Sequence, residues 1–204
     1  MALTPSSAPL VWIDCEMTGL NPLTDSILQI YCLITTPDLV PIDAVGLDLI
    51  IHHPPSVLSS MPAWCQHHHT ATNLIARVTT SLLPPSGAGP LLLAYIKSHI
   101  PEKGVGLLAG SSVHMDKEFL RRLCPEVLEY LDYRILDVSA VKECVRRWAP
   151  RWVLDGAPLK RGGHEAKMDV EDSLAEVGYY RRVFFGELGD KPLEGWKAKA
   201  VGEV

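Results

Sequence analysis

A run of apolar residues that ends in two carboxylates constrains this chain more than any other feature. Leu10 to Ile13 are four apolar residues in a row, which predicts a strand buried on both faces. Side chains alternate along a strand, so Asp14 and Glu16, which follow directly, project to the same side. Two neighbouring carboxylates repel each other and resist the loss of water. The pair therefore predicts a site with a compensating positive charge, usually a divalent metal ion.

The other apolar patterns predict one α/β domain with a mixed five-stranded sheet flanked by helices. Further strands are expected at residues 26–36, 44–52, 105–109 and 135–138. Helices are expected within 57–80 and at 91–99, 115–123, 139–148 and 166–185, with Ser139 capping the helix that ends at Trp148 and a Pro/Gly-rich loop over 84–90. Three strands followed by alternating helices and strands are typical of a mixed sheet.

Composition limits the function classes. The 204 residues are 47% apolar, which is enough for a sizeable core, and the net charge of −5 excludes a broad basic surface for long nucleic acid. The five cysteines are scattered without a C-x-x-C pair, which indicates reduced thiols. Neither a secretory signal nor a presequence is visible, and no apolar run is long enough for a bilayer. A cytoplasmic protein with no membrane partner is expected.

The domain boundaries follow from the same patterns. Residues 1–9 are expected to be a short N-terminal extension, 10–185 the folded domain, and 186–204 a flexible C-terminal tail rich in Gly, Lys, Glu and Ala. No internal repeat and no clean linker divides the domain.

Two later segments carry acidic residues that could join the first pair. Asp116 follows the expected strand at 105–109, and Asp169 begins the expected helix at 166–185, five residues after His164. Each residue also has an ordinary explanation, because an Asp in the first turn favours the helix dipole and surface loops often contain a histidine. Only their combination points to a site.

That combination resembles one known family. An Asp-x-Glu pair on a first strand, a Gly-Ser-Ser-x-x-x-Asp segment after a later strand and a His-x-x-x-x-Asp segment at the last long helix are similar to the motifs of DEDDh 3′→5′ exonucleases. Within that family the chain resembles oligoribonucleases from about residue 10 to 185. The strings that carry the resemblance are Trp12 to Leu20, Tyr133 to Ser139 and Ser173 to Arg181. The resemblance implies an RNase H-like fold.

The resemblance also implies a catalytic centre. Two ions, Mg²⁺ or Mn²⁺, would be held by Asp14, Glu16, Asp116 and Asp169, with Asp14 bridging both. His164 would act as the general base on the attacking water, which requires a neutral imidazole. Hydrolysis of very short RNAs, especially 5′-phosphorylated dinucleotides, to mononucleotides is the activity expected.

Two groups of side chains would bind the substrate. By resemblance, Leu20 and Trp64 stack against or wedge between two bases. Without that context Trp64 is about equally well explained as a core aromatic. The sequence leaves both explanations open for this residue.

The remaining contacts would be made at the 5′ end of the RNA. The resemblance assigns the terminal phosphate to His69, Ser112, Arg134 and Ser139, although His69 belongs to a run of three histidines that could simply be a polar surface. Tyr133 resembles a residue that reaches the active site of the second subunit in a homodimer. A site closed at the 5′ phosphate would favour two-residue substrates.

Two departures and two alternatives accompany this interpretation. Ser111 stands where the family usually has Asn, and Gln29 replaces an acidic residue. A DEDDh exonuclease for longer RNA or DNA ends is the nearest alternative, and turnover against substrate length would separate the two. A catalytically silent nucleic-acid-binding protein on the same fold is the other, which the complete set of acidic residues disfavours.

Overall fold

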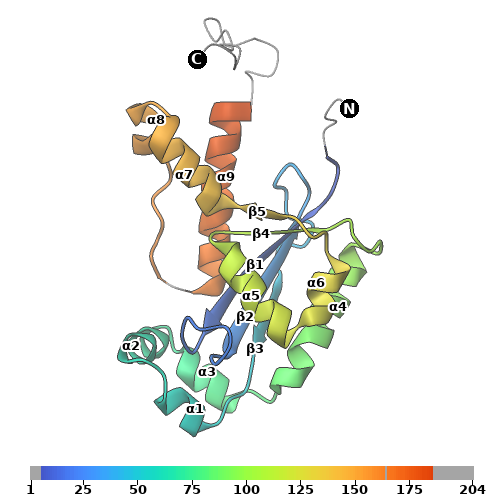
Figure 1. The fold of residues 1–204 in the computed structure, drawn as a ribbon, viewed down its shortest axis with the longest axis vertical. Coiled ribbons are helices and arrows are strands. Elements are labelled where there is room, and N and C mark those ends of the chain that lie inside the picture. The colour runs from blue at the N-terminus through green and yellow to red at the C-terminus, as the bar shows by residue number, and fades with distance from the viewer. Residues whose placement is uncertain (1–5, 164, 186–204) are drawn as a thin grey trace, which may run out of the picture.

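The computed structural model describes residues 6–163 and 165–185 and contains one mixed sheet (Figure 1). Its strands lie in the order β3-β2-β1-β4-β5. The antiparallel part pairs β1 with β2 and β2 with β3, whereas β4 is parallel to both β1 and β5. The bounds are β1 Leu10–Met17, β2 Ile27–Thr35, β3 Leu47–Ile50, β4 Leu107–Gly110 and β5 Ile135–Asp137. The predicted five-stranded mixed sheet is confirmed.

Helices cover the sheet and its lower end (Figure 1). Their bounds are α1 Pro55–Ser59, α2 Ala63–Ala71, α3 Leu74–Thr80, α4 Pro85–His99, α5 Val113–Leu123, α6 Pro125–Tyr130, α7 Val138–Trp148, α8 Arg151–Asp155 and α9 Ala166–Phe185. The short helices α1, α2 and α3 gather near the end of β1. Within the described ranges, no helix combines the length and the apolar content that crossing a bilayer requires.

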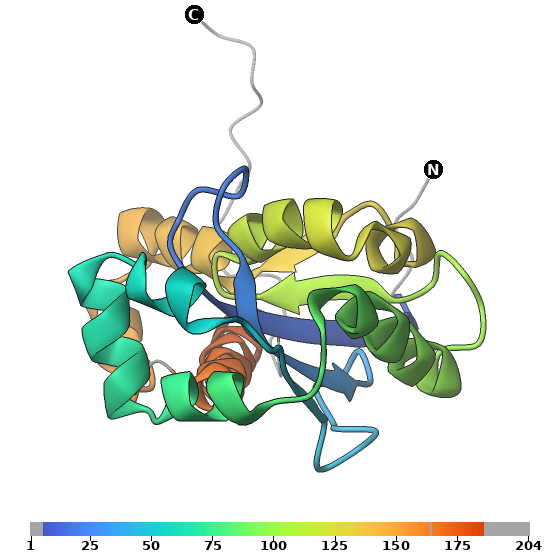
Figure 2. The ribbon, with the colours of Figure 1, turned by 90° about the horizontal axis from the view of Figure 1, so that it is seen from below.

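Alternating side chains of β1 sort the core into two layers. Odd-numbered residues such as Val11 belong to a buried cluster with Phe119 of α5 and with α4 and α6. Even-numbered residues such as Trp12 belong to a second cluster with Val170 of α9. Figure 2 shows α5 and α9 on opposite sides of the sheet. Each even-numbered position of β1 therefore faces the α9 side.

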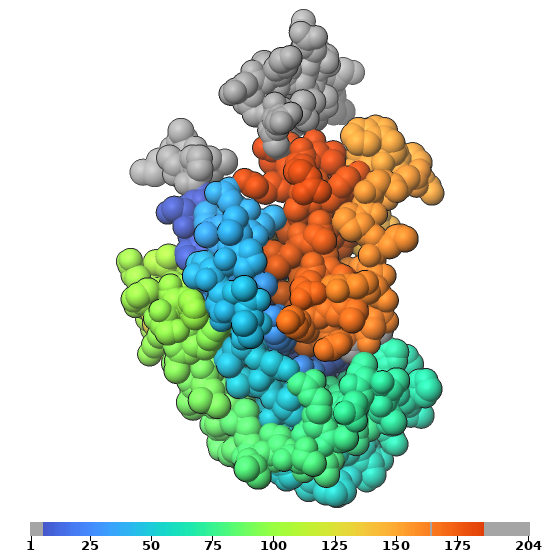
Figure 3. All heavy atoms as spheres, turned by 180° about the vertical axis from the view of Figure 1, so that it is seen from behind, coloured from blue at the N-terminus to red at the C-terminus, as the bar shows by residue number. Residues whose placement is uncertain are grey.

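On the back of the molecule, α9 and the connection between β2 and β3 lie side by side (Figure 3). Arg181 of α9 pairs with Asp38 of that connection. This contact ties α9 to the antiparallel part of the sheet.

The Pro/Gly-rich segment 84–90 is not the loop that the sequence predicts. It forms the beginning of α4, where Pro85 occupies the first turn. A Cβ on Gly89 would lie 1.9 Å from a carboxylate oxygen of Glu126 and 3.4 Å from Cα of Cys124. A side chain at this position would have to displace the Glu126 carboxylate, and local propensity carries no sign of that contact.

Other expectations differ in detail. Ser139 does not cap α7, because the N-cap is Asp137, whose Oδ1 accepts from the Ser139 N–H at 2.9 Å. The expected strand over 44–52 is shorter, the helical stretch 57–80 consists of three helices, and α6 and α8 were not expected. The expected tail 186–204 lies outside the described residues.

Candidate active site

The carboxylates at the end of β1 lie together with a third one from α9. Each of Asp14, Glu16 and Asp169 offers an oxygen within 4.8 Å of the others. Asp14 and Glu16 occupy even-numbered positions of β1, which face the side of the sheet where Asp169 stands in the first turn of α9. The expectation that these residues share one side is confirmed.

Asp116 approaches the same strand end from the other face of the sheet. It lies in the first turn of α5 and is buried, with 6% of its surface exposed. Its Oδ1 accepts from the Cys15 N–H at 2.9 Å, so it is bonded to the backbone between Asp14 and Glu16. Asp116 is therefore adjacent to the three-carboxylate group without being a member of it.

Burial and mutual repulsion raise the pKa values of this cluster. Burial raises the pKa of Glu16 to about 8, and the charges of Asp169 and Asp116 add to the effect. Burial also raises the pKa of Asp116 to about 7, against the lowering effect of the Cys15 N–H. The pKa of Asp14 is raised well above its usual range, first by burial and then by Asp116 and Glu16.

This donor set fits a divalent cation. Carboxylate oxygens are the ligands that Mg²⁺ and Mn²⁺ prefer, and a bound cation would offset the repulsion that helps to raise the pKa values of Asp14 and Glu16. The arrangement can hold positive charge at the carboxyl end of β1.

A cavity of about 480 Å³ opens beside Glu16. Its lining includes Leu20 and Trp64, whose surfaces are 80% and 60% exposed. Trp64 is thus not the core aromatic that the sequence left open. Two large exposed apolar side chains beside an acidic cluster can hold flat, apolar groups such as bases.

His69 of α2 also lines this cavity but is itself buried. Its Nε2 donates to the carbonyl oxygen of Met17 at 2.9 Å, and its Nδ1 lies 3.9 Å from Glu16 Oε2. The histidine therefore joins α2 to the end of β1 and stands next to the carboxylates.

A cluster of hydroxyls forms where β4 and β5 end. Ser139 Oγ lies 2.9 Å from Ser112 Oγ and 3.0 Å from Ser111 Oγ. Below it, Asp137 Oδ1 accepts from the Ser112 N–H at 2.9 Å. The structure thus brings together Ser112 and Ser139, as the sequence suggested. Sequence reasoning missed Lys160, which donates to Ser111 Oγ at 3.1 Å and follows no recognisable pattern.

Tyr133 and Arg134 lie outside the hydroxyl cluster. They precede β5 at its amino end, whereas Ser139 follows its carboxyl end. The guanidinium of Arg134 stacks 4.3 Å over the ring of Tyr133, which is 73% exposed, and its Nη1 is 3.6 Å from Asp132. The fold does not bring Arg134 into the hydroxyl cluster, and His164 lies outside the described residues.

Comparison with known proteins places these features in a family. The sequence profile of the RNase T family, described as an exonuclease family, matches residues 11–177. An oligoribonuclease of Vibrio parahaemolyticus is 41% identical, over 88% of this chain and 97% of that one. A mitochondrial oligoribonuclease of Saccharomyces cerevisiae is 42% identical, over 84% of this chain and 66% of that protein.

A solved structure supports the same architecture. Exonuclease I from Methylocaldum szegediense superposes with a TM-score of 0.61 at 18% identity, over 89% of this chain and 42% of that one. This likeness concerns the fold alone. The family profile and the similar oligoribonucleases define the chain as an exonuclease, an enzyme that hydrolyses phosphodiester bonds. The chain belongs to the oligoribonucleases within the RNase T, or DEDDh, exonuclease family.

Proposed function

We propose that this protein removes nucleotides in the 3′→5′ direction from very short RNAs, and that 5′-phosphorylated dinucleotides are its main substrates. The observation that carries this proposal is the cavity with Leu20 and Trp64 directly beside Glu16. Bases held there lie next to the acidic cluster, where a phosphodiester would be cut. The similarity to oligoribonucleases supports a short RNA as the substrate.

The acidic residues would hold two Mg²⁺ or Mn²⁺ ions. Asp14, Glu16 and Asp169 stand close enough to be ligands of the same ion, and Asp116 is bonded to the backbone beside them. Such ions, when bound, activate a water and neutralise the charge on the phosphate in the transition state. The chain's own part is to hold these oxygens in place and to keep the site in a low-dielectric surrounding.

His164 would take the proton from the attacking water. In the sequence it lies five residues before Asp169. We expect His164→Ala to lower kcat by roughly 100- to 10,000-fold while metal binding survives. Turnover measurements check the loss of kcat, and Mn²⁺ titration by calorimetry checks that metal binding is kept. A variant that turned over normally would remove His164 from the mechanism.

The hydroxyl cluster would receive the 5′ phosphate. Ser112 and Ser139 are 2.9 Å apart between their Oγ atoms. Ser112 follows β4, which pairs with β1, and Ser139 follows β5, which pairs with β4. In a homodimer, the exposed Tyr133 would reach the site of the second subunit and His69 would contribute from the first. Sedimentation of the full chain would reveal a monomer if this arrangement is wrong. A cytoplasmic location also stays a prediction.

Turnover against RNA length is the main test. Rates on 5′-phosphorylated RNAs of two and seven residues should favour the two-mer strongly with Mn²⁺ or Mg²⁺, and a chelator should abolish both. Equal rates, or a preference for the seven-mer or for DNA, would contradict the proposed substrate and favour an exonuclease for longer ends.

A further inference from the structure

A lysine reaches the hydroxyl cluster from the segment between α8 and α9. Lys160 Nζ donates to Ser111 Oγ at 3.1 Å, and Ser111 Oγ is 3.0 Å from Ser139 Oγ. Ser111 directly follows β4, the strand that pairs with β1.

The neighbouring residue fixes this segment on α9. Arg161 donates from its backbone N–H and its Nε to the carboxylate of Asp172, at 2.8 and 2.7 Å, and from Nη2 to Glu171 at 2.9 Å. Asp172 is only 8% exposed. Because Arg161 binds α9 while Lys160 contacts the turn after β4, the segment spans the two, and the position of the ammonium is constrained from both sides.

The hydroxyl cluster needs such a cation to accept an anion. The carboxylate of Asp137 lies beneath it, accepting from Ser112 and Ser139 through Oδ1 and bonded to His114 Nδ1 through Oδ2. Its negative charge opposes a phosphate at the same place. An ammonium has three donors, so Lys160 retains two after its bond to Ser111.

We propose that Lys160 is a specificity-determining residue that contacts the 5′-terminal phosphate of the substrate, in a position held by Ser111 and by the anchored Arg161. This rests on the proposed function. Arg134, the cation that the sequence suggested for this role, is instead stacked on Tyr133 at the far end of β5.

Paired substrates test the proposal. kcat/KM is measured for pApA and for ApA, which lacks the 5′ phosphate, on the full-length protein and on Lys160→Met, which keeps the apolar stem and loses the charge. Lys103→Met is the matched control, because Lys103 is an exposed lysine in the turn before β4, at the opposite end of that strand. Lys160→Arg tests whether a positive charge restores the effect.

A selective loss is the expected result. Lys160→Met should lower kcat/KM for pApA by roughly 10- to 100-fold, the effect of one charge-assisted hydrogen bond, and change ApA by less than about threefold. Lys160→Arg should recover part of the pApA activity, and Lys103→Met should behave as the parent. Equal losses on both substrates, or none on either, would overturn the assignment.

Binding without turnover separates this inference from the proposed function. In Ca²⁺, calorimetric titration should show tighter binding of pApA than of ApA, and Lys160→Met should remove that difference. If the protein binds pApA more tightly than ApA but does not hydrolyse RNA, the proposed function alone is refuted. If the protein binds pApA and ApA equally tightly, or if Lys160→Met keeps the difference in affinity, the role of Lys160 is refuted.

Discussion

Two buried histidines flank the same pair of residues in the β1–β2 ladder, yet they border different cavities. Met17 and Ile27 are partners where the register of the ladder shifts. His69 bonds to the carbonyl oxygen of Met17 at 2.9 Å and His53 to that of Ile27 at 3.0 Å. In each case the histidine contacts a carbonyl at the irregular end of the ladder.

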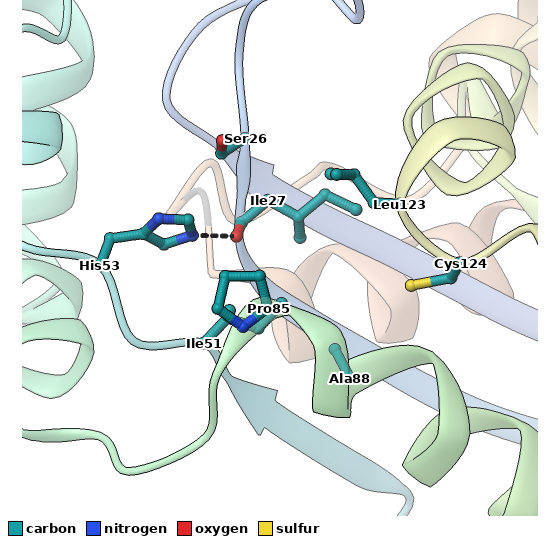
Figure 4. A pocket seen from close by; sticks show the side chains of 8 residues that line it. All are labelled: Ser26, Ile27, Ile51, His53, Pro85, Ala88, Leu123 and Cys124. Atoms are coloured by element: carbon teal, nitrogen blue, oxygen red, sulfur yellow. Dashed lines mark hydrogen bonds between the residues drawn. The ribbon is translucent and has the colours of Figure 1, made fainter.

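The surroundings of the two histidines differ. His53 borders a small cavity of about 70 Å³ whose lining is mostly apolar (Figure 4). His69 borders the cavity of about 480 Å³ that contains Glu16, Leu20 and Trp64. The comparison teaches that a buried histidine bonded to a strand carbonyl does not by itself mark a site. What distinguishes the two places is that Glu16, Leu20 and Trp64 line the cavity of His69 and not that of His53.

The largest expected effect is at Asp14, in the acidic cluster beside the cavity that His69 borders. Asp14→Asn should lower kcat by roughly 1,000-fold or more, because the charge that faces Glu16 and Asp169 is removed from a cation site. Its metal-free melting temperature should stay equal or rise, since one repelling charge is gone. Near-normal turnover would show that the acidic cluster is not the reaction centre.

A smaller effect is expected at Trp64, in the cavity that we propose binds bases. Trp64→Ala should raise KM for a dinucleotide about 10- to 100-fold through loss of base stacking. Trp148→Ala is the matched control, because Trp148 is also exposed (77%) and belongs to α7, outside this cavity. Steady-state kinetics of both variants check the difference. Equal KM changes would mean that the cavity does not hold bases.

The histidines themselves provide the most direct comparison. His53→Ala and His69→Ala should each lose about 1–3 kcal/mol of unfolding free energy, because each leaves a carbonyl without its partner. Only His69→Ala should lower activity beyond what its lost stability explains. Urea denaturation and turnover, both measured well below the melting temperature, separate the two effects. Equal activity in both variants would make His69 purely structural.

The smallest expected effect concerns pH and stability without metal. Burial raises the pKa of Glu16 from 4.5 to about 8, so the folded state binds more protons than the unfolded state between those values. Stability is then fully present below pH 4.5 and is lost as pH rises through 8. The melting temperature of chelated protein should fall by roughly 10 °C between pH 5 and 8 from this group, and Mg²⁺ should reduce the fall.

Much of this side of the molecule could be predicted from local sequence. The four apolar residues before Asp14 specify a buried strand, and its two-residue period places Glu16 on the same face. Asp169 could be placed because the helix pattern of α9 begins just before it. Short-range periodicity carried this information.

What the sequence did not reveal depends on contacts between distant segments. Gly89 looked like part of a loop, because nothing local shows that Glu126 packs against it. Asp137 was not recognised as a cap whose carboxylate also binds the N–H of Ser112, 25 residues away. Lys160 was overlooked for the same reason, since its partner Ser111 lies 49 residues earlier.

The alternation of β1 has a consequence for how this chain tolerates insertions. Odd positions face α5 and even positions face α9, so adding one residue within the strand would exchange the two sets. The carboxylates would then point into the apolar layer, and Trp12 would leave its own. Folding and activity would be lost together, because the core and the acidic centre depend on the same alternation of side chains along β1.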